Sequence, residues 1–213
     1  IGIALDGDAD RVILTDAAGR VVSGDRVLGM FALDFKAKGA LNRDTLVVTS
    51  MSNFGLYEAM AAAGVRVETT EVGDRYVIEK MRAEGYNLGG EESGHVIFMD
   101  YATTGDGIIA ALQVLALMKR QNKTLAELAQ FMREYPRRLA SLPVAEKKPF
   151  ESLPQVRRAL AECEAALRGQ GRVVLRYSGT EPKVRVLVEA RTEGDVERWT
   201  GVLTRALREE LEA

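Results

Sequence analysis

The strongest constraint on the fold is the alternation of short apolar runs with longer amphipathic stretches through the middle of the chain. Residues 45–50 and 65–72 read as strands, whereas apolar residues recur at helical spacing through 25–39, 53–64 and 74–85. Each of these helical stretches ends at a glycine, as helices commonly do. Two further strands and two further helices are expected at 86–90, 95–100, 105–121 and 124–135. This order predicts an α/β fold, with a mixed, mainly parallel sheet covered by helices on both faces.

The pattern changes at residues 135–149, which hold three prolines and several basic residues. We interpret this stretch as a linker followed by an edge strand. A helix, two strands and a final helix are expected after it, at 153–167, 172–178, 183–190 and 195–211. The second half of the chain is therefore predicted to form a smaller α+β domain.

The first residues do not fit either domain. Residues 1–5 form a continuous apolar run, typical of a strand covered on both faces, and residues 12–23 read as a hairpin. Because a two-stranded ribbon is marginally stable alone, we expect its neighbouring strands to lie upstream. The predicted domains are thus a remnant of a preceding domain at 1–22, an α/β domain at 23–134 and an α+β domain at 135–213.

Composition excludes several classes of protein. The 213 residues are 46% hydrophobic and 28% charged, with a net charge of −2, so no basic surface for nucleic acid or anionic membrane is indicated. The longest apolar run, 107–118, is shorter than the roughly 20 residues of a membrane span. A single cysteine, Cys163, has no partner for an internal disulfide, which fits a reducing cytosol.

The acidic motif DGDADR follows the first apolar run. Asp6, Asp8 and Asp10 offer hard oxygen ligands of the kind that Mg²⁺ prefers, if Gly7 and Ala9 let the chain curl so that the oxygens converge. A calcium EF-hand is excluded, because Arg11 and Ala17 stand where glycine and glutamate are needed. A solvated acidic turn is the alternative.

Three other loops could carry chemistry. Residues 73–76 join a strand to a helix, where α/β sheets often bind ligands, although Asp74 could simply cap the helix. The loop GGEESGH holds Glu91, Ser93 and the only histidine, His95. Carboxylates and a serine suit sugar hydroxyls, and a histidine can pass protons or meet a phosphate, although a lone histidine is usually structural.

The last loop is RYSGTEPKVR. It combines Ser178 and Thr180 hydroxyls, the flexible backbone of Gly179 and the guanidinium of Arg176, with Arg185 adding charge from the next strand. These groups suit a phosphate, and a hairpin turn with chance hydroxyls is the alternative.

DGDADR, GEESGH and RYSGTEP, in this order, together resemble the α-D-phosphohexomutase superfamily. The resemblance covers essentially the whole chain and is strongest to members that act on glucosamine phosphates, through the stretches VGDRYVIEKM, FMDYATTGDG and SGTEPKVRVLVEA. It implies four domains around a cleft, of which this chain supplies the end of the second, the third and the fourth. N-terminal domains of the same protein are then partners of this chain, and a homodimer stays open.

The resemblance also implies residue roles. Asp6, Asp8 and Asp10 would bind Mg²⁺, Arg11 would contact a phosphoserine of the first domain, and His95 would lie near the transferring group. Glu91 and Ser93 would hold sugar hydroxyls. The non-reacting phosphate would bind at Arg176, Ser178, Gly179 and Thr180.

The activity implied is the interconversion of glucosamine 6-phosphate and glucosamine 1-phosphate through the phosphoserine and a sugar 1,6-bisphosphate. Because no serine loop of that kind is present here, we expect the chain alone to be inactive. The alternatives are a phosphomannomutase or phosphoglucomutase of the same superfamily, a haloacid-dehalogenase-type phosphatase and a non-catalytic sugar-phosphate-binding module.

Overall fold

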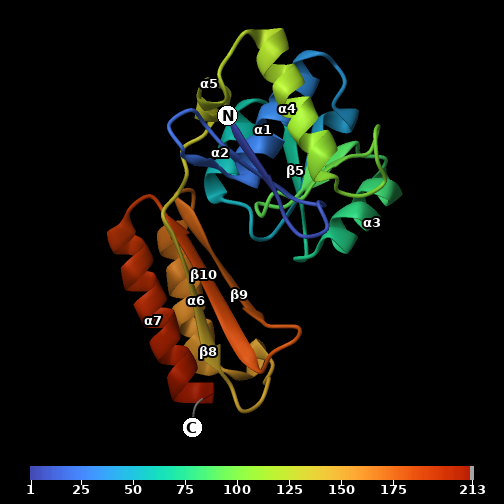
Figure 1. The fold of residues 1–213 in the computed structure, drawn as a ribbon. Helices are drawn as coiled ribbons and strands as arrows, with labels where there is room; N and C mark the ends of the chain where they lie inside the picture. The colour runs from blue at the N-terminus through green and yellow to red at the C-terminus, as the bar shows by residue number, and fades with distance from the viewer. Residues whose placement is uncertain (212–213) are drawn as a thin grey trace. The chain divides into compact units, whose positions relative to one another are not determined.

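The structure, a computed structural model, describes residues 1–211, and the chain divides into two compact units (Figure 1). Unit 1 is Ile1–Glu134 and unit 2 begins at Tyr135. Each unit has its own hydrophobic core. Among residues 1–211, no helix has both the length and the apolar character that crossing a membrane would require.

Unit 1 is built on a four-stranded sheet in the order β5-β4-β6-β7. The strands β4 and β5 are parallel, β4 and β6 are parallel, and β6 and β7 are antiparallel, so the sheet is mixed and mainly parallel as predicted. The strands are β4 (Thr45–Thr49), β5 (Arg66–Thr70), β6 (Leu88–Gly90) and β7 (Val96–Phe98).

Helices cover both faces of this sheet because successive side chains of a strand point to opposite sides. Leu46 and Val48 of β4 belong to the large core that includes α1 (Gly24–Ala37), whereas Val47 packs with residues of α3 (Asp74–Glu84). The other helices of unit 1 are α2 (Phe54–Ala62), α4 (Gly107–Gln121) and α5 (Leu125–Leu128), with short 3-10 helices at Asn42–Asp44 and Ala129–Phe131.

The helix expected at 124–135 is much shorter than predicted. Its capping box is confirmed, since Thr124 and Glu127 exchange the two expected hydrogen bonds. The α-helix nevertheless ends at Leu128, passes into the 3-10 turn and is extended by Met132. Phe131 packs against Gly29 of α1, where an added Cβ would lie 2.2 Å from the ring. The α-helix therefore ends at the point where the chain packs against α1.

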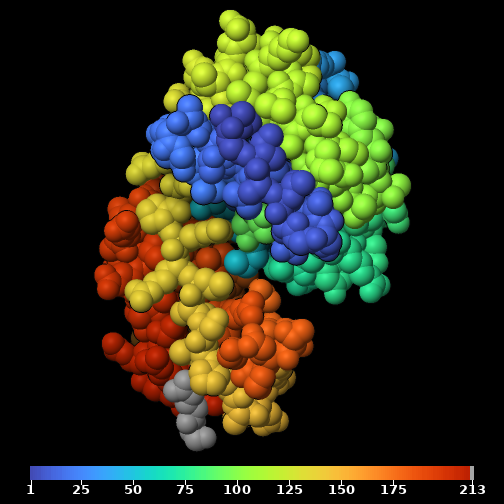
Figure 2. Space-filling view, viewed as in Figure 1, coloured from blue at the N-terminus to red at the C-terminus, as the bar shows by residue number. Residues whose placement is uncertain are grey.

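The N-terminal residues form a separate antiparallel sheet, β1-β2-β3, with β1 at Gly2–Leu5, β2 at Val12–Thr15 and β3 at Val21–Val22. Val12, Leu14 and Val22 join the core of unit 1. The expectation that the first strand is covered on both faces is not met, because Ile3 and Leu5 are 45% and 41% exposed. Figure 2 shows this strand (dark blue) on the surface beside α4 (yellow-green). Its assignment to a preceding domain stays a prediction.

Unit 2 is a three-stranded antiparallel sheet, β8-β10-β9, packed against two helices (Figure 1). The strands are β8 (Arg137–Pro143), β9 (Gly171–Tyr177) and β10 (Lys183–Ala190), and the helices are α6 (Pro154–Leu167) and α7 (Glu193–Leu211), with a 3-10 turn at Phe150–Ser152. The predicted edge strand is β8. Val184, Val186 and Val188 of β10 are fully buried on the helix-covered face.

Two buried polar groups of unit 2 have clear structural roles. Burial raises the pKa of the Cys163 thiol to about 11, with a smaller contribution from Glu164, so this cysteine is an inert core residue. The carboxylate of Glu189 on β10 is completely buried and accepts a hydrogen bond from Arg172 Nε at 2.6 Å, and Arg137 lies 4.0 Å away.

Replacement of Glu189 by alanine should destabilise unit 2 by about 3 kcal/mol or more, because it removes the buried carboxylate that pairs with the largely buried Arg172 guanidinium. Trp199, the only tryptophan, is in this core, so urea unfolding followed by its fluorescence reports on unit 2. The control is Glu162→Ala, which breaks an exposed pair with Arg158 and should change stability by less than about 0.5 kcal/mol. Equal effects of the two substitutions would contradict a stabilising role for the buried pair.

Candidate functional site

The three aspartates of the acidic motif converge. One carboxylate oxygen from each of Asp6, Asp8 and Asp10 lies within 4.8 Å of the others. Arg11 offers partial compensation, with its Nε 3.9 Å from Asp6 Oδ2 and 3.8 Å from Asp10 Oδ1. Asp10 Oδ1 is buried and has no hydrogen-bond partner within residues 1–211. A hard-oxygen donor set with an unsatisfied buried oxygen fits a small divalent cation.

The curl of this loop depends on Ala9 rather than on Gly7. Ala9 has a φ of 60°, in the left-handed region that non-glycine residues seldom occupy. Its amide donates to the Asp6 carbonyl, and its carbonyl accepts from the Gly107 amide at 2.9 Å. The expected freedom of Gly7 is not used, since its φ is not positive and a Cβ there would meet nothing within 4 Å.

Glycines bring the acidic loop against two other loops of unit 1. Val12 N–H donates to the Gly94 carbonyl at 3.1 Å, and a Cβ on Gly94 would lie 2.3 Å from the Val12 carbonyl oxygen. On the other side, a Cβ on Gly107 would lie 2.6 Å from the Arg11 carbonyl oxygen. The backbones therefore approach closely only because both positions lack side chains.

The histidine joins these loops through both ring nitrogens. His95 is 1% exposed, its Nδ1 lies 3.1 Å from Asp10 Oδ2, and its Nε2 accepts a hydrogen bond from the Gly105 amide at 3.2 Å. His95 thus contacts a predicted metal ligand directly. Its predicted role near a transferring phosphoryl group stays a prediction.

The rest of the GGEESGH loop, which joins β6 to β7, reaches the 73–76 loop. Glu91 is largely buried and accepts a hydrogen bond from the Gly73 amide at 3.1 Å. The Ser93 hydroxyl is buried and has no hydrogen-bond partner in the described part of the chain. The carbonyl of Glu92 accepts from the Gly24 amide at the start of α1. The acidic loop, the GGEESGH loop (residues 89–95, called the glutamate loop) and the 73–76 loop of unit 1 therefore form one contiguous group.

In unit 2, the SGT motif is a turn between β9 and β10. Ser178 is 3% exposed, and its hydroxyl accepts from the Glu181 amide at 3.3 Å, so it shapes the turn. Gly179 and Thr180 are exposed. Gly179 does not need a positive φ, but a Cβ there would meet nothing within 4 Å, which leaves the turn open to a ligand.

Of the three cationic side chains that β9 and β10 place next to this turn, Lys183 and Arg185 pair with a carboxylate, whereas Arg176 does not. Glu181 accepts hydrogen bonds from Lys183 at 2.5 Å and Arg185 at 2.9 Å, and these two cations, Lys183 foremost, lower the pKa of its carboxyl below the ordinary value. Arg176 lies opposite Arg185 across the two strands. Within residues 1–211, Arg176 makes no ion pair, which leaves its guanidinium available for an anion.

Several contacts were not predicted. Lys147, from the segment interpreted as a linker, donates to the Ser178 carbonyl at 2.6 Å, and Tyr177 donates to the Lys148 carbonyl at 2.7 Å. The close approaches at Gly105 to His95 and at Gly107 to Arg11 are also absent from the predictions. The basic residues that follow the edge strand could have indicated the contact of Lys147 with Ser178. The close approach of two backbones, in contrast, leaves no pattern in a single sequence.

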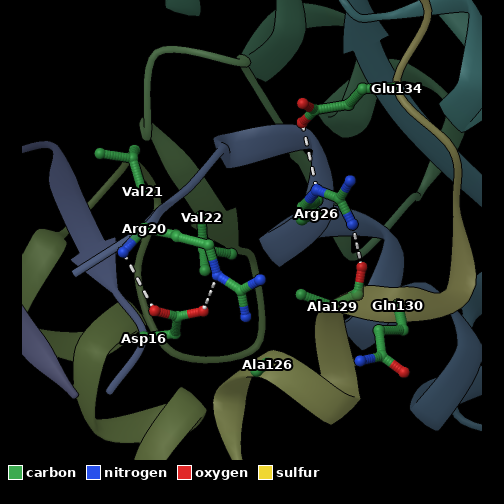
Figure 3. A pocket seen from close by; sticks show the side chains of 9 residues that line it. All are labelled: Asp16, Arg20, Val21, Val22, Arg26, Ala126, Ala129, Gln130 and Glu134. Carbon is green, nitrogen blue, oxygen red and sulfur yellow. Dashed lines mark hydrogen bonds and ion pairs between the residues drawn. The ribbon is translucent and has the colours of Figure 1, made fainter. Parts of the chain in front are cut away.

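Figure 3 shows a pocket of about 260 Å³ in unit 1 that lies away from these residues. Its guanidiniums are already paired, since Arg20 binds Asp16 at 2.8 Å and Arg26 binds Glu134 at 3.1 Å. Arg26 also donates to the Ala129 carbonyl. We therefore assign the pocket no ligand.

Two features indicate the class of the protein. Unit 1 combines a mixed, mainly parallel sheet with three converging aspartates, and unit 2 is an α+β domain with an SGT turn. The chain matches the phosphoglucomutase/phosphomannomutase α/β/α domain III over residues 23–135 and the C-terminal domain of the same family over 139–204. The first of these matches alone covers more than half of the 213 residues. The chain therefore belongs to the phosphoglucomutase/phosphomannomutase family.

Curated relatives are more specific. The chain is 49% identical over 211 residues to a phosphoglucosamine mutase of Geobacter sp. (strain M21), covering 99% of this chain and 46% of the relative. It is 52% identical to one of Leifsonia xyli subsp. xyli, covering 99% and 47%. The chain thus spans about half the length of the curated relatives it matches.

Solved structures agree on the fold. Aspergillus fumigatus N-acetylphosphoglucosamine mutase, in complex with GlcNAc-6P and magnesium, matches with a TM-score of 0.79 at 23% identity, over 98% of this chain and 48% of that one. A putative phosphomannomutase from Thermus thermophilus matches with a TM-score of 0.63 at 26% identity, over 98% and 44%.

The close approach at Gly94 generates a stability prediction. Gly94→Ala should lower the free energy of unfolding of unit 1 by about 2 kcal/mol or more, because the residue has a φ of 97° and its Cβ would strike the Val12 carbonyl. Gly7→Ala, in the acidic loop against which Gly94 packs but in open space, is the control and should be nearly neutral. Denaturation followed by circular dichroism measures both, and a harmless Gly94→Ala would contradict the docking of the two loops.

Proposed function

We propose that this chain forms the C-terminal domains of a phosphoglucosamine mutase, which interconverts glucosamine 6-phosphate and glucosamine 1-phosphate. The observation that carries the proposal is the convergence of Asp6, Asp8 and Asp10 beside the glutamate loop. Family membership favours this function over a haloacid-dehalogenase-type phosphatase, and identity near 50% to phosphoglucosamine mutases supports the amino-sugar substrate.

The proposed cofactor is Mg²⁺, held by Asp6, Asp8 and Asp10. The fit is supported by their oxygen donors and by Asp10 Oδ1, which is buried and accepts no hydrogen bond within residues 1–211. When bound, the ion would offset negative charge on the oxygen that gives up or receives the phosphoryl group. Arg11, half exposed beside the trio, is proposed to contact the phosphoserine that a preceding domain would supply.

The substrate is proposed to bind through two units. In unit 1, the buried Ser93 hydroxyl lacks a partner in the described chain and can pair with a sugar hydroxyl, with Glu91 beside it. In unit 2, the non-reacting phosphate would meet Arg176, Arg185 and the open turn at Ser178, Gly179 and Thr180. Phosphoryl transfer depends mainly on such positioning and on charge stabilisation.

The decisive experiment is an activity assay of the full-length protein with glucosamine, mannose and glucose phosphates. Preference for glucosamine 1-phosphate and 6-phosphate supports the proposal, and preference for mannose or glucose phosphates supports the related mutases. A hydrolase without isomerisation, or binding without turnover, would contradict it. A reducing cytosol, suggested by the lone Cys163, is the proposed location.

Metal binding can be tested on one ligand at a time. Asp8→Asn should weaken Mg²⁺ binding to the purified chain by about tenfold or more, because it removes one of three anionic donors. The control is Asp44→Asn, an exposed carboxylate paired with Lys36 elsewhere in unit 1, which should leave the affinity unchanged. Calorimetry measures both, and equal affinities for the two variants would count against the trio as the metal site.

Phosphate binding can be tested at the turn of unit 2. Arg176→Ala should weaken glucosamine 6-phosphate binding by about tenfold, the effect of losing one charge-assisted hydrogen bond. Arg158→Ala is the matched control, because Arg158 is exposed on α6 and paired with Glu162. If both variants bind the sugar phosphate as the unsubstituted chain does, Arg176 is not part of the site.

A further inference from the structure

The turn between β9 and β10 is held by the segment that follows β8. The ammonium of Lys147 donates a hydrogen bond to the Ser178 carbonyl at 2.6 Å. The hydroxyl of Tyr177 donates to the Lys148 carbonyl at 2.7 Å, and the Tyr177 ring stacks on Phe150 with the ring centroids 4.5 Å apart. Three contacts therefore tie this segment to the two residues that lead from β9 into the turn.

The contact of Lys147 fixes the orientation of one peptide group in the turn. The peptide bond between Ser178 and Gly179 is trans, as are all peptide bonds in the described chain. In a planar trans peptide, the carbonyl and the amide point in opposite directions. Because the Ser178 carbonyl points to the Lys147 ammonium, the Gly179 amide of the same peptide group points away from Lys147.

The amides at the tip of the turn have no acceptor in the described chain. Gly179 and Thr180 are exposed, and neither of their amides donates a hydrogen bond within residues 1–211. A Cβ at Gly179 would meet nothing within 4 Å, so the turn is open at this point. Successive backbone amides at a turn form concave sites that bind anions such as phosphate.

The charge of Lys147 is not neutralised by a carboxylate. In the described part of the chain Lys147 makes no ion pair, whereas Lys183 and Arg185 share Glu181. Its ammonium has three N–H donors, of which the Ser178 carbonyl accepts one. A cation bound to a carbonyl also polarises the peptide group, which makes the amide on the other side a stronger donor.

From this geometry we propose that Lys147 is a positioning residue for phosphate binding: by holding the Ser178 carbonyl, it directs the Gly179 amide to the phosphate. The inference rests on the proposed function, because it takes the SGT turn as the site of the non-reacting phosphate of the sugar phosphate. It adds to that site a residue from the segment that the sequence indicated only as a linker.

Two neighbouring lysines allow a matched test. Lys147→Met removes the donor to Ser178 together with one positive charge. Lys148→Met removes the same charge one residue away, where the ammonium makes no hydrogen bond or ion pair within residues 1–211, and it keeps the main-chain carbonyl that Tyr177 binds. Lys147→Arg retains a charged donor and should restore the contact.

The measurement is a titration of the purified, isotope-labelled chain with glucosamine 6-phosphate and with inorganic phosphate, followed by nuclear magnetic resonance. We expect Lys147→Met to bind glucosamine 6-phosphate about tenfold more weakly, the effect of losing one charge-assisted contact. Lys148→Met and Lys147→Arg should bind it within about threefold of the unsubstituted chain.

Two chemical shifts report the proposed geometry directly. The ¹³C shift of the Ser178 carbonyl should change in Lys147→Met without any ligand, because that carbonyl loses its hydrogen bond. The Gly179 amide proton of the unsubstituted chain should move downfield when either ligand binds, and it should move less in Lys147→Met at saturation. A general loss of stability would not produce this selective change.

The outcomes distinguish the inference from the function on which it rests. Equal affinities of Lys147→Met and Lys148→Met, or ligand-induced shifts at Arg176 and Thr180 without one at Gly179, would overturn the positioning role while the phosphate site stands. No shift anywhere in the turn with either ligand would overturn the proposed phosphate site, and the inference with it. The Gly179 shift is measured on the unsubstituted chain, so poor folding of Lys147→Met does not remove the test.

Discussion

Close backbone contact between the acidic loop and its two neighbours is the constraint on which the candidate site depends. Three like charges at residues 6, 8 and 10 repel one another, and the hydrogen bond from the Arg11 amide to Asp6 Oδ1 is one contact within the loop that opposes this repulsion. The hydrogen bonds from Val12 to Gly94 and from Gly107 to Ala9 hold the loop against its neighbours. The energy that keeps Ala9 in a left-handed conformation comes from these contacts and from the core below them.

The candidate site residues of the two units carry opposite charges. Unit 1 gathers the carboxylates of Asp6, Asp8 and Asp10, with Arg11 as a partial counter-charge, and a cation is proposed to complete this group. Unit 2 gathers cations and uses Glu181 to balance two of them, so that Arg176 remains without an ion pair in the part of the chain described here. Glu181 thereby relieves the repulsion expected where Arg176 and Arg185 face each other across the strands.

Periodicity located nearly every helix and strand, because apolar spacing is a local signal and both cores are built from it. The departures have tertiary causes. The helix after Thr124 stops early where Phe131 packs against Gly29. Ile3 and Leu5 of the first strand are exposed, because no other part of the described chain covers them. At the candidate site, the residue types alone indicated which side chains could supply oxygen ligands for a metal ion, namely Asp6, Asp8 and Asp10. The contact of His95 with Asp10 joins residues 85 positions apart, which spacing could not reveal.

Charge decides what the acidic loop can accept. Three carboxylates against one guanidinium leave this part of unit 1 strongly negative, which would repel the phosphate of a sugar phosphate. The divalent cation proposed to bind Asp6, Asp8 and Asp10 would offset that excess negative charge. His95, from the loop between β6 and β7, contacts Asp10 through Nδ1 at 3.1 Å, so a residue outside the acidic loop also helps to order it. Contacts within unit 1 thus order the acidic loop, whereas neutralisation of its excess charge would be left to the proposed cation.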